Sequence, residues 1–202
     1  MPKDGKPTRD KILAESRALI YDNGFSGTSI DNILERTGIT KGAFFYHFKT
    51  KNHLAKSLIE EYARDDKAHM EHGLKVTESL NDKPSERLLA FVQIFIDGMS
   101  SLEEPPSCLY ASYTSENKQF DEEIKELIKG SILEWRDTFI DLLEQAKINE
   151  TSNIEIDIPS LADQFVVIFE GAFIVSKALN EPDISAKQLI HLRNYLKFLL
   201  SN

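Results

Sequence analysis

The chain has 202 residues, of which 41% are hydrophobic and 28% charged, as is usual for a globular protein. No apolar run reaches the roughly 18 residues that cross a bilayer, and the first residues, MPKDGKPTRD, contain no apolar signal core, so we expect a cytoplasmic protein that does not bind a membrane. The single cysteine, Cys108, excludes an intrachain disulfide and a cysteine-based metal cage.

The net charge of −9 is unevenly distributed along the chain. Residues 1–56 contain ten basic and six acidic side chains, a net charge of +4, whereas the remaining 14 basic and 27 acidic groups give −13. An acidic body repels a polyanion everywhere except where a basic surface meets it. The distribution therefore favours the N-terminal region as the part that approaches nucleic acid.

Three short helices are expected before residue 49. Thr8 is a candidate N-cap of the first helix, and Gly24 can end it in a left-handed conformation. Thr28–Asp31 has the spacing of a capping box and begins the second helix. Gly38 then allows a tight turn before Thr40, which is placed to cap the third. Two helices joined by a glycine-containing turn indicate a helix-turn-helix unit.

The third helix has two different faces. Phe44 and Phe48 lie four residues apart and are expected to pack on the first two helices. A helix-turn-helix unit inserts the N-terminal end of its third helix into the major groove, where free backbone N–H groups favour a phosphate. The residues that can then approach DNA are Thr40, Lys41, Gly42, Tyr46, His47 and Lys51. The competing interpretation is an amphipathic helical hairpin with an incidental basic rim.

The rest of the chain is also expected to be helical, because apolar residues recur with helical period and strand patterns are scarce. A long helix runs from Lys51 to about Leu74, and another follows Pro84. A short segment, SCLYASYTS, follows Pro105-Pro106, and a helix then extends from about Phe120 to Lys147. NETSN is expected to be a loop, and IEIDI an extended lead into the next helix.

The last two helices, at about 161–179 and 185–200, differ from the others. The first is apolar on more than one face, and the second begins with a Ser185-x-x-Gln188 capping box. A helix that is apolar nearly all round needs more cover than a modest domain supplies. Pairing with the same two helices of a second chain predicts a two-fold homodimer.

Aromatic side chains in this body are expected to be mainly core, and some of them to line a ligand pocket. Glu170 is an isolated carboxylate in the apolar sequence VVIFEGAFIV, where it faces a ligand, a partner chain or the helix edge. The candidate ligand-binding residues are Phe95, Tyr110, Tyr113, Trp135, Phe139, Phe169, Glu170 and Phe173.

Two further groups are candidate sensing sites. Asp65, His69 and His72 share one helix face and have metal-ligand chemistry, but a solvated face explains them better. Cys108 is expected to be a buried small side chain rather than a redox thiol, because its neighbouring charges, Glu103 and Glu104, are negative. We expect no metal, no cofactor and no enzyme activity, since the sequence has no glycine-rich phosphate loop, nucleophile elbow or HExxH pair.

Residues 37–59 have the sequence TGITKGAFFYHFKTKNHLAKSLI, preceded by Thr28 and Ile33. Over about residues 9–60 the chain resembles the TetR family of bacterial transcriptional regulators; beyond that it is similar in length and helical content. The resemblance implies phosphate contacts from Thr28 and Ser29, groove contacts from Thr40, Lys41, Gly42 and Ala43, and backbone contacts from Tyr46, His47 and Lys51.

Two positions depart from the family pattern. Phe45 stands where a tyrosine often reaches the DNA, so any contact there must be apolar, such as with a thymine methyl. His53 stands where an acid often completes the cap of the fourth helix, which predicts a weaker cap near neutral pH.

We therefore predict an all-α fold of about nine helices. Residues 1–48 form a helix-turn-helix DNA-binding domain, and residues 49–202 form a helical ligand-sensing and dimerisation domain. The predicted function is sequence-specific binding of double-stranded operator DNA, most simply repression relieved by an unknown small-molecule inducer. The alternatives are a helical ligand- or protein-binding module without DNA activity, and an enzyme of unrecognised chemistry.

Overall fold

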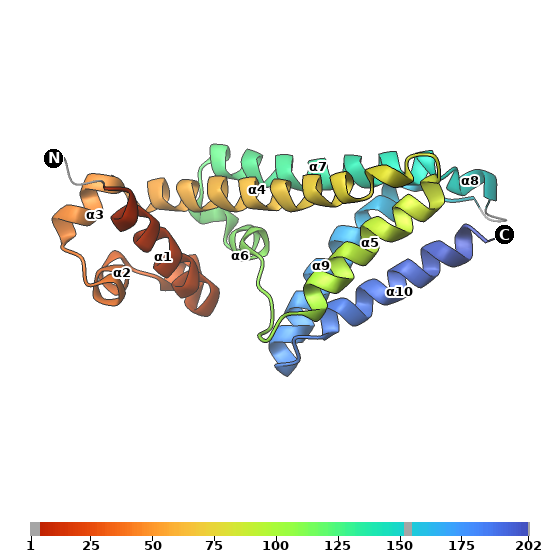
Figure 1. Cartoon of the computed structure of the whole chain (residues 1–202). Coiled ribbons are helices and arrows are strands. Elements are labelled where there is room, and N and C mark those ends of the chain that lie inside the picture. The colour runs from red at the N-terminus through yellow and green to blue at the C-terminus, as the bar shows by residue number, and fades with distance from the viewer. Residues whose placement is uncertain (1–4, 152–154, 202) are drawn as a thin grey trace. The chain divides into compact units, whose positions relative to one another are not determined.

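The computed structural model describes residues 5–151 and 155–201, and within these residues there is no β-strand. Nine α-helices of seven or more residues, one four-residue helix and two 3-10 turns make up this part of the chain, which confirms the predicted all-α class (Figure 1). In chain order they are α1 (Lys6–Gly27), α2 (Ile30–Thr37), α3 (Lys41–His47), α4 (Lys51–Val76), η1 (Glu78–Leu80), α5 (Pro84–Ser100), α6 (Leu109–Ser115), η2 (Asn117–Gln119), α7 (Glu122–Gln145), α8 (Ile148–Thr151), α9 (Ile158–Leu179) and α10 (Ile184–Leu199).

Three predicted helix starts are wrong by one to a few residues. Helix α1 begins before Thr8, because Pro7 occupies its first turn and Gly5 is the N-cap. The capping box of α2 is formed by Ser29 and Asn32, one residue later than expected. Helix α10 starts at Ile184 without a side-chain cap, and Ser185 is buried inside its first turn.

The expected loop NETSN is partly helical, and its Ser152 and Asn153 lie outside the described residues. Lys147 adopts a left-handed conformation with φ 54°, which turns the chain after α7, and Ile148 is fully buried. That buried side chain holds the short helix α8 against the core. Of the expected extended segment IEIDI, Glu155–Asp157 precede α9 as non-helical chain, and Asp157 caps α9 by accepting a hydrogen bond from Ser160 N at 3.1 Å.

The described chain divides into two compact units. The first contains the described residues up to Asp65 together with Leu109–Lys129, so that α6, η2 and the start of α7 belong with the helix-turn-helix helices. Helix α1 packs against α2 and α6. The predicted domain boundary after residue 48 stays a prediction. The fully buried side chains of this unit include Ile12, Ile20, Ile33, Phe44, Phe48, Leu58 and Tyr113.

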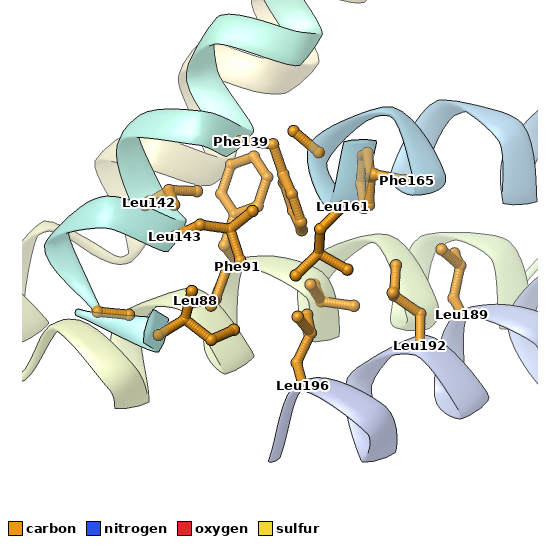
Figure 2. Packing of buried hydrophobic residues seen from close by; sticks show 14 of the residues in the cluster. Leu88, Phe91, Phe139, Leu142, Leu143, Leu161, Phe165, Leu189, Leu192 and Leu196 are labelled. Atoms are coloured by element: carbon orange, nitrogen blue, oxygen red, sulfur yellow. The ribbon is translucent and has the colours of Figure 1, made fainter. Parts of the chain in front are cut away.

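The second unit contains Asp66–Cys108 and the described residues from Gly130 onward. In Figure 2, the rings of Phe139 and Phe165 lie together, and they stack with centroids 4.6 Å apart. Helix α10 packs on α5 and α9 through a row of leucines. Each fully buried leucine or phenylalanine contributes about 1.5–3 kcal/mol of transfer free energy. The other labelled members of this core are Leu88, Phe91, Leu142, Leu143, Leu161, Leu189, Leu192 and Leu196.

Helix α9 is long and apolar enough to cross a membrane by length and composition alone. Its contacts in this fold differ from those of a membrane-spanning helix. Leu161 and Phe165 are buried in the core of the second unit, and Asp163 forms an ion pair with Arg136 at 2.5 Å. Both observations show that one side of α9 packs within the protein.

The opposite side of α9 and the adjoining part of α10 expose an apolar surface. Gly171 lies within this surface and adds no side-chain bulk. We call it the α9–α10 face, and its exposed apolar members are Val167, Ile174, Val175, Leu179, Tyr195 and Phe198. Natural monomers seldom leave so many large apolar side chains exposed together without a partner.

Candidate DNA-binding interface

Helix α3 is held in place by a cap at its start and two rings beneath it. Ala43 N donates a hydrogen bond to Thr40 Oγ1 at 3.2 Å, and Gly38 makes the preceding turn with φ 68°, as predicted. Phe44 and Phe48 are fully buried, with ring centroids 5.9 Å apart. A seven-residue helix has little stability of its own, so this packing fixes its orientation.

The outer face of α3 combines an aromatic ring with hydrogen-bond donors. Lys41 and Gly42 are exposed, and Tyr46 is 75% exposed, so its hydroxyl and ring face solvent. The edge of the Tyr46 ring meets the half-buried imidazole of His47 at a centroid distance of 4.9 Å. An ammonium, a phenol and an imidazole on one small surface are suited to phosphate oxygens and base edges.

Phe45 and Ala43 lie at the edge of this face and are partly buried. The Phe45 ring meets Phe44 edge to face at 5.4 Å. The Lys49 ammonium donates to the Phe45 carbonyl oxygen at 3.1 Å, which places a second positive charge at the C-terminal end of α3. The chemistry available from Phe45 itself is apolar contact, as the sequence predicts.

Thr28 and Ser29, which were expected to meet phosphate, are already used within the protein. Thr28 is buried and donates to the Gly24 carbonyl oxygen at 2.8 Å. Ser29 remains exposed at the start of α2, where its hydroxyl accepts a hydrogen bond from Asn32 N at 3.1 Å. Only Ser29 therefore combines exposure with a position at a helix start.

Lys51 is turned toward the protein. Its ammonium donates to the carbonyl oxygen of Phe25 and lies 4.0 Å from the centroid of that ring, a cation–π geometry. Burial lowers the pKa of Lys51, and the charge of Glu116 opposes that shift. A DNA phosphate would have to compete with Phe25 for this ammonium.

The start of α4 is capped although His53 stands in place of an acid, and the predicted weakness of this cap stays a prediction. Thr50 Oγ1 accepts a hydrogen bond from His53 N at 3.0 Å, and His53 Nδ1 accepts one from Lys49 N at 3.2 Å. The imidazole thus accepts the backbone hydrogen bond that a carboxylate would accept in a capping box. Its Nδ1 can accept only when it carries no proton.

Glu116, between α6 and η2, is a residue that sequence reasoning missed. Its carboxylate accepts hydrogen bonds from Phe25 N at 2.7 Å, from Ser26 N at 2.8 Å and from the Ser26 hydroxyl. Burial raises the pKa of Glu116, but these hydrogen bonds and the charge of Lys51 outweigh it and hold the pKa below its usual range. We call this arrangement the Glu116 clasp.

The clasp closes on the C-terminal turn of α1, which depends on a glycine. Gly24 has φ 74°, and a Cβ placed there would lie 2.7 Å from Glu116 Oε1. Phe25, Tyr113 and Phe120 pack together beside it, with the last two stacked at 4.3 Å. Gly24 was visible in the sequence as a helix stop, but its partner lies about 90 residues away and has no local signal.

The predicted ligand-binding residues are divided between the two units. Tyr110 and Tyr113 belong to the first unit, where Tyr113 is fully buried and Tyr110 meets Tyr62 edge to face at 4.8 Å. The structure brings the remaining residues together in the second unit: Phe95, Trp135, Phe139, Phe169, Glu170 and Phe173. Of these, Phe139 is closed into the core, and the others keep some exposure.

The two other candidate sensing groups have no metal-like geometry. In the part of the chain that the structure describes, no three or more His, Cys, Asp or Glu side chains converge as metal ligands. Asp65, His69 and His72 are exposed, and Asp65 contacts Arg64 at 3.8 Å. Cys108 is buried and forms no disulfide.

Comparison with known families gives matches along most of the chain. Residues 12–58 match the profile of bacterial regulatory proteins of the tetR family, and residues 84–192 match the tetracyclin repressor-like C-terminal domain. The first match covers the helix-turn-helix helices and the start of α4. The second covers more than half of all residues, including α5, α7 and α9.

Individual proteins give the same result. An uncharacterised HTH-type regulator of Lactococcus lactis is 36% identical over 67 residues, 33% of this chain and 34% of that protein. The chain thus spans about a third of that relative. The transcriptional regulator AcuR of Cereibacter sphaeroides is 25% identical over 90% of this chain and 85% of its own. The crystal structure of the regulatory protein TetR from Rhodobacter sphaeroides shares the fold, with a TM-score of 0.74, 21% identity, and coverage of 92% of this chain and 97% of that one.

Proposed function

The chain belongs to the tetR family of bacterial regulatory proteins, and on this premise we propose that it is a dimeric repressor which leaves its operator when its C-terminal half binds a small molecule. It is a helix-turn-helix regulator of transcription that binds DNA. The regulator acts on DNA, and so we place it in the cytoplasm. The finer assignments below rest on the geometry of each surface.

The assignment of the DNA-binding residues rests on the outer face of α3. Tyr46 is 75% exposed, while Phe44 and Phe48, two residues before and after it, are fully buried and fix the opposite face of α3. We assign groove or phosphate contacts to Thr40, Lys41, Gly42, Ala43, Phe45, Tyr46 and His47, and a phosphate contact to Ser29. Thr28 contributes by shaping the turn before α2. Lys51 contributes mainly through Phe25, which it ties to the start of α4.

The second protomer is assigned to the α9–α10 face. Ile174 and Phe198 are 66% and 63% exposed, and a second copy of the same face would bury both. A two-fold pairing of this kind presents two α3 helices to two half-sites, which a helix-turn-helix dimer reads at about 34–36 Å or a multiple of it.

A direct test is fluorescence anisotropy of labelled DNA from upstream of the protein's own gene, titrated with the full chain at two salt concentrations. Scrambled DNA of equal length is the control. Tight binding that exceeds the control and weakens steeply with salt supports operator binding, because phosphate contacts release counterions. If a random-sequence selection also yields no preferred DNA, the proposal is overturned.

Ligand-relieved repression has its own test. A molecule that releases the DNA must bind the DNA-free protein more tightly than the DNA-bound protein. The factor by which operator DNA weakens effector binding equals the factor by which the effector weakens operator binding. Effector affinity is therefore measured with and without saturating operator. Equal affinities in the two titrations would rule out this coupling.

A further inference from the structure

Glu170 on α9 places a carboxylate beside the aromatic rings of the second unit. One of its oxygens, Oε2, is buried and has no hydrogen-bond partner among the described residues, although the side chain as a whole is only partly buried. A buried carboxylate oxygen without a partner is unfavourable unless something binds it. This orphaned oxygen is not explained by the packing of the core.

A second carboxylate lies near it. Asp66 on α4 accepts a hydrogen bond from Trp135 Nε1 on α7 at 2.8 Å. Burial raises the pKa of Glu170 above its ordinary value of 4.5; a hydrogen bond with the Cys108 thiol lowers it, and the charge of Asp66 raises it further. Two helices, α4 and α9, therefore bring carboxylates close enough to interact electrostatically.

The basic side chains that follow Asp66 and Trp135 in the sequence form ion pairs with other acids. Lys67 follows Asp66 in the sequence, and its ammonium donates to Glu134 at 2.8 Å. Arg136 follows Trp135, and its guanidinium donates to both oxygens of Asp163 at 2.5 and 2.8 Å. The positive charge of each is thus already paired with a carboxylate.

A chain of partly exposed aromatic rings runs from Trp135, which contacts Asp66, to Phe169, which precedes Glu170 in α9. Phe95 meets Trp135 at a centroid distance of 5.3 Å and Phe169 at 6.0 Å, and Phe169 meets Phe173 at 5.7 Å. All four rings are partly exposed, in contrast to the closed core rings Phe91, Phe139 and Phe165. Ring faces attract cations, and most strongly the face of tryptophan.

We propose that the second unit binds an organic cation with an apolar or aromatic body, whose charged group is held by Glu170 and Asp66 beside the ring of Trp135. A cation relieves the repulsion between the two carboxylates and gives the orphaned oxygen a partner. A neutral molecule leaves that repulsion in place, and an anion increases it. The inference deepens the proposed function, on which it rests for the role of this cation as the effector.

The chain provides its own reporter for this site. Trp135 is its only tryptophan, so selectively excited tryptophan emission reports directly on the proposed position. The probes are benzylamine, benzyl alcohol and benzoate, which are similar in size and differ in charge, and the larger pair tetraphenylphosphonium and tetraphenylborate. We expect saturable emission changes with the two cations, and affinities at least about tenfold weaker for the neutral and anionic partners.

Three variants locate the charge. Glu170→Gln keeps the volume and removes the carboxylate, and Asp66→Asn keeps an acceptor for Trp135 while removing the second charge. Each should weaken cation binding by about tenfold. Glu144→Gln, on the exposed side of α7, removes the same charge away from the site and should bind cations as the wild type does. Unchanged thermal melting of the variants shows that they are folded.

The pH dependence of cation affinity distinguishes direct binding by Glu170 from a purely structural role of this residue. Because a bound cation favours the ionised carboxylate, cation affinity in the wild type should increase with pH above 4.5, while Glu170 loses its proton. Glu170→Gln should flatten this increase. The proposal is overturned if the anion or neutral probe binds as well as the cation of its size, if Glu170→Gln changes nothing, or if neither cation gives a saturable response.

The same probes separate this inference from the proposed function. They are added to the complex of the full chain with its selected operator DNA. Cations that change Trp135 emission without releasing the DNA support the cation site and contradict its role as an effector site. Release of the DNA by benzoate or tetraphenylborate alone supports ligand-relieved repression and contradicts the cation site.

Discussion

Helices α3 and α9 both expose large apolar side chains, and the surroundings of these side chains differ. On α3, the 75% exposed Tyr46 contacts His47, and the same helix begins with the exposed Lys41. On α9, the 64% exposed Val167 and 66% exposed Ile174 stand beside Gly171. An exposed ring among hydrogen-bond donors and positive charges suits a hydrated, charged partner such as DNA. Aliphatic side chains around a glycine suit an apolar protein surface from which water is excluded.

The two surfaces are also supported differently. Helix α3 has seven residues and depends on Thr40, the buried Phe44 and the capped start of α4. Helix α9 has 22 residues, and its N-terminal half is stabilised by the core of the second unit. Changes beneath α3 should therefore disturb its function, whereas changes beneath α9 should mainly lower overall stability.

The largest effect is expected from charges placed on the α9–α10 face. Val167→Glu combined with Ile174→Glu would bury unpaired carboxylates in a dimer, at about 3–5 kcal/mol each, and should weaken dimerisation by more than about 100-fold. Analytical ultracentrifugation should show monomers at concentrations where the wild type is dimeric. Leu133→Glu, an exposed apolar residue on α7, is the matched control. A double variant that remains dimeric would show that the dimer interface lies elsewhere on the chain.

The next effect concerns the outer face of α3. Lys41→Ala should lower operator affinity by about tenfold and reduce the salt slope by about 1, because one phosphate contact is lost. Anisotropy titrations at several salt concentrations measure both quantities. Lys75→Ala removes an exposed lysine at the end of α4 and should leave both unchanged. Equal losses in the two variants would show that only overall charge matters.

Opening the Glu116 clasp should have a moderate effect on stability. Glu116→Gln keeps the shape but loses the charged acceptor for Ser26 and Phe25, so the free energy of unfolding should fall by about 1–2 kcal/mol. Because the folded-state pKa of Glu116 lies below its usual value of 4.5, its contribution is present above pH 4.5 and is lost as pH falls through the lowered pKa.

Urea unfolding at several pH values measures this difference. The gap between wild type and Glu116→Gln should close on acidification. Glu150→Gln, on the exposed surface of α8, is a control with the same change of charge. A gap that stays constant down to low pH would mean that the carboxylate charge is unimportant there.

The smallest effect is expected at the start of α4. His53→Glu should raise the free energy of unfolding by a few tenths of a kcal/mol, because a carboxylate both returns the cap and interacts favourably with the helix N-terminus. His53→Ala should lower it by about 1 kcal/mol or less, since Lys49 N loses its acceptor. Thermal melting resolves the order of the three proteins, and a His53→Ala variant as stable as the wild type would contradict the cap.

These comparisons also explain what the sequence could and could not predict. Gly38, Thr40 and the pair Phe44 and Phe48 were placed correctly, because a turn, a cap and an i, i+4 pair depend on neighbours in the sequence. The box at α2 was misplaced because Thr28 and Ser29 are both acceptable caps, and only the turn geometry at Gly24 directs Thr28 inward.

The remaining differences arise from contacts between distant parts of the chain. Lys51 has the sequence context of a phosphate contact, yet Phe25 draws its ammonium inward from 26 residues away. Glu116 and Tyr113 were indistinguishable from other residues of the body until their packing with α1 placed them in the first unit. Periodicity specifies which face of a helix is buried, but not which helix covers it.

The division of the first unit between two stretches of sequence has a consequence for biosynthesis. Residues up to Asp65 leave the ribosome before Tyr113, Glu116 and Phe120 have been made, so the C-terminal turn of α1 first meets water instead of its aromatic partners. At about 5–20 residues per second, the 64 residues from Asp65 to Lys129 take roughly 3–13 s to synthesise. During that interval the nascent DNA-binding helices lack part of their core. A newly made chain therefore completes the first unit only after Leu109–Lys129 has also been translated.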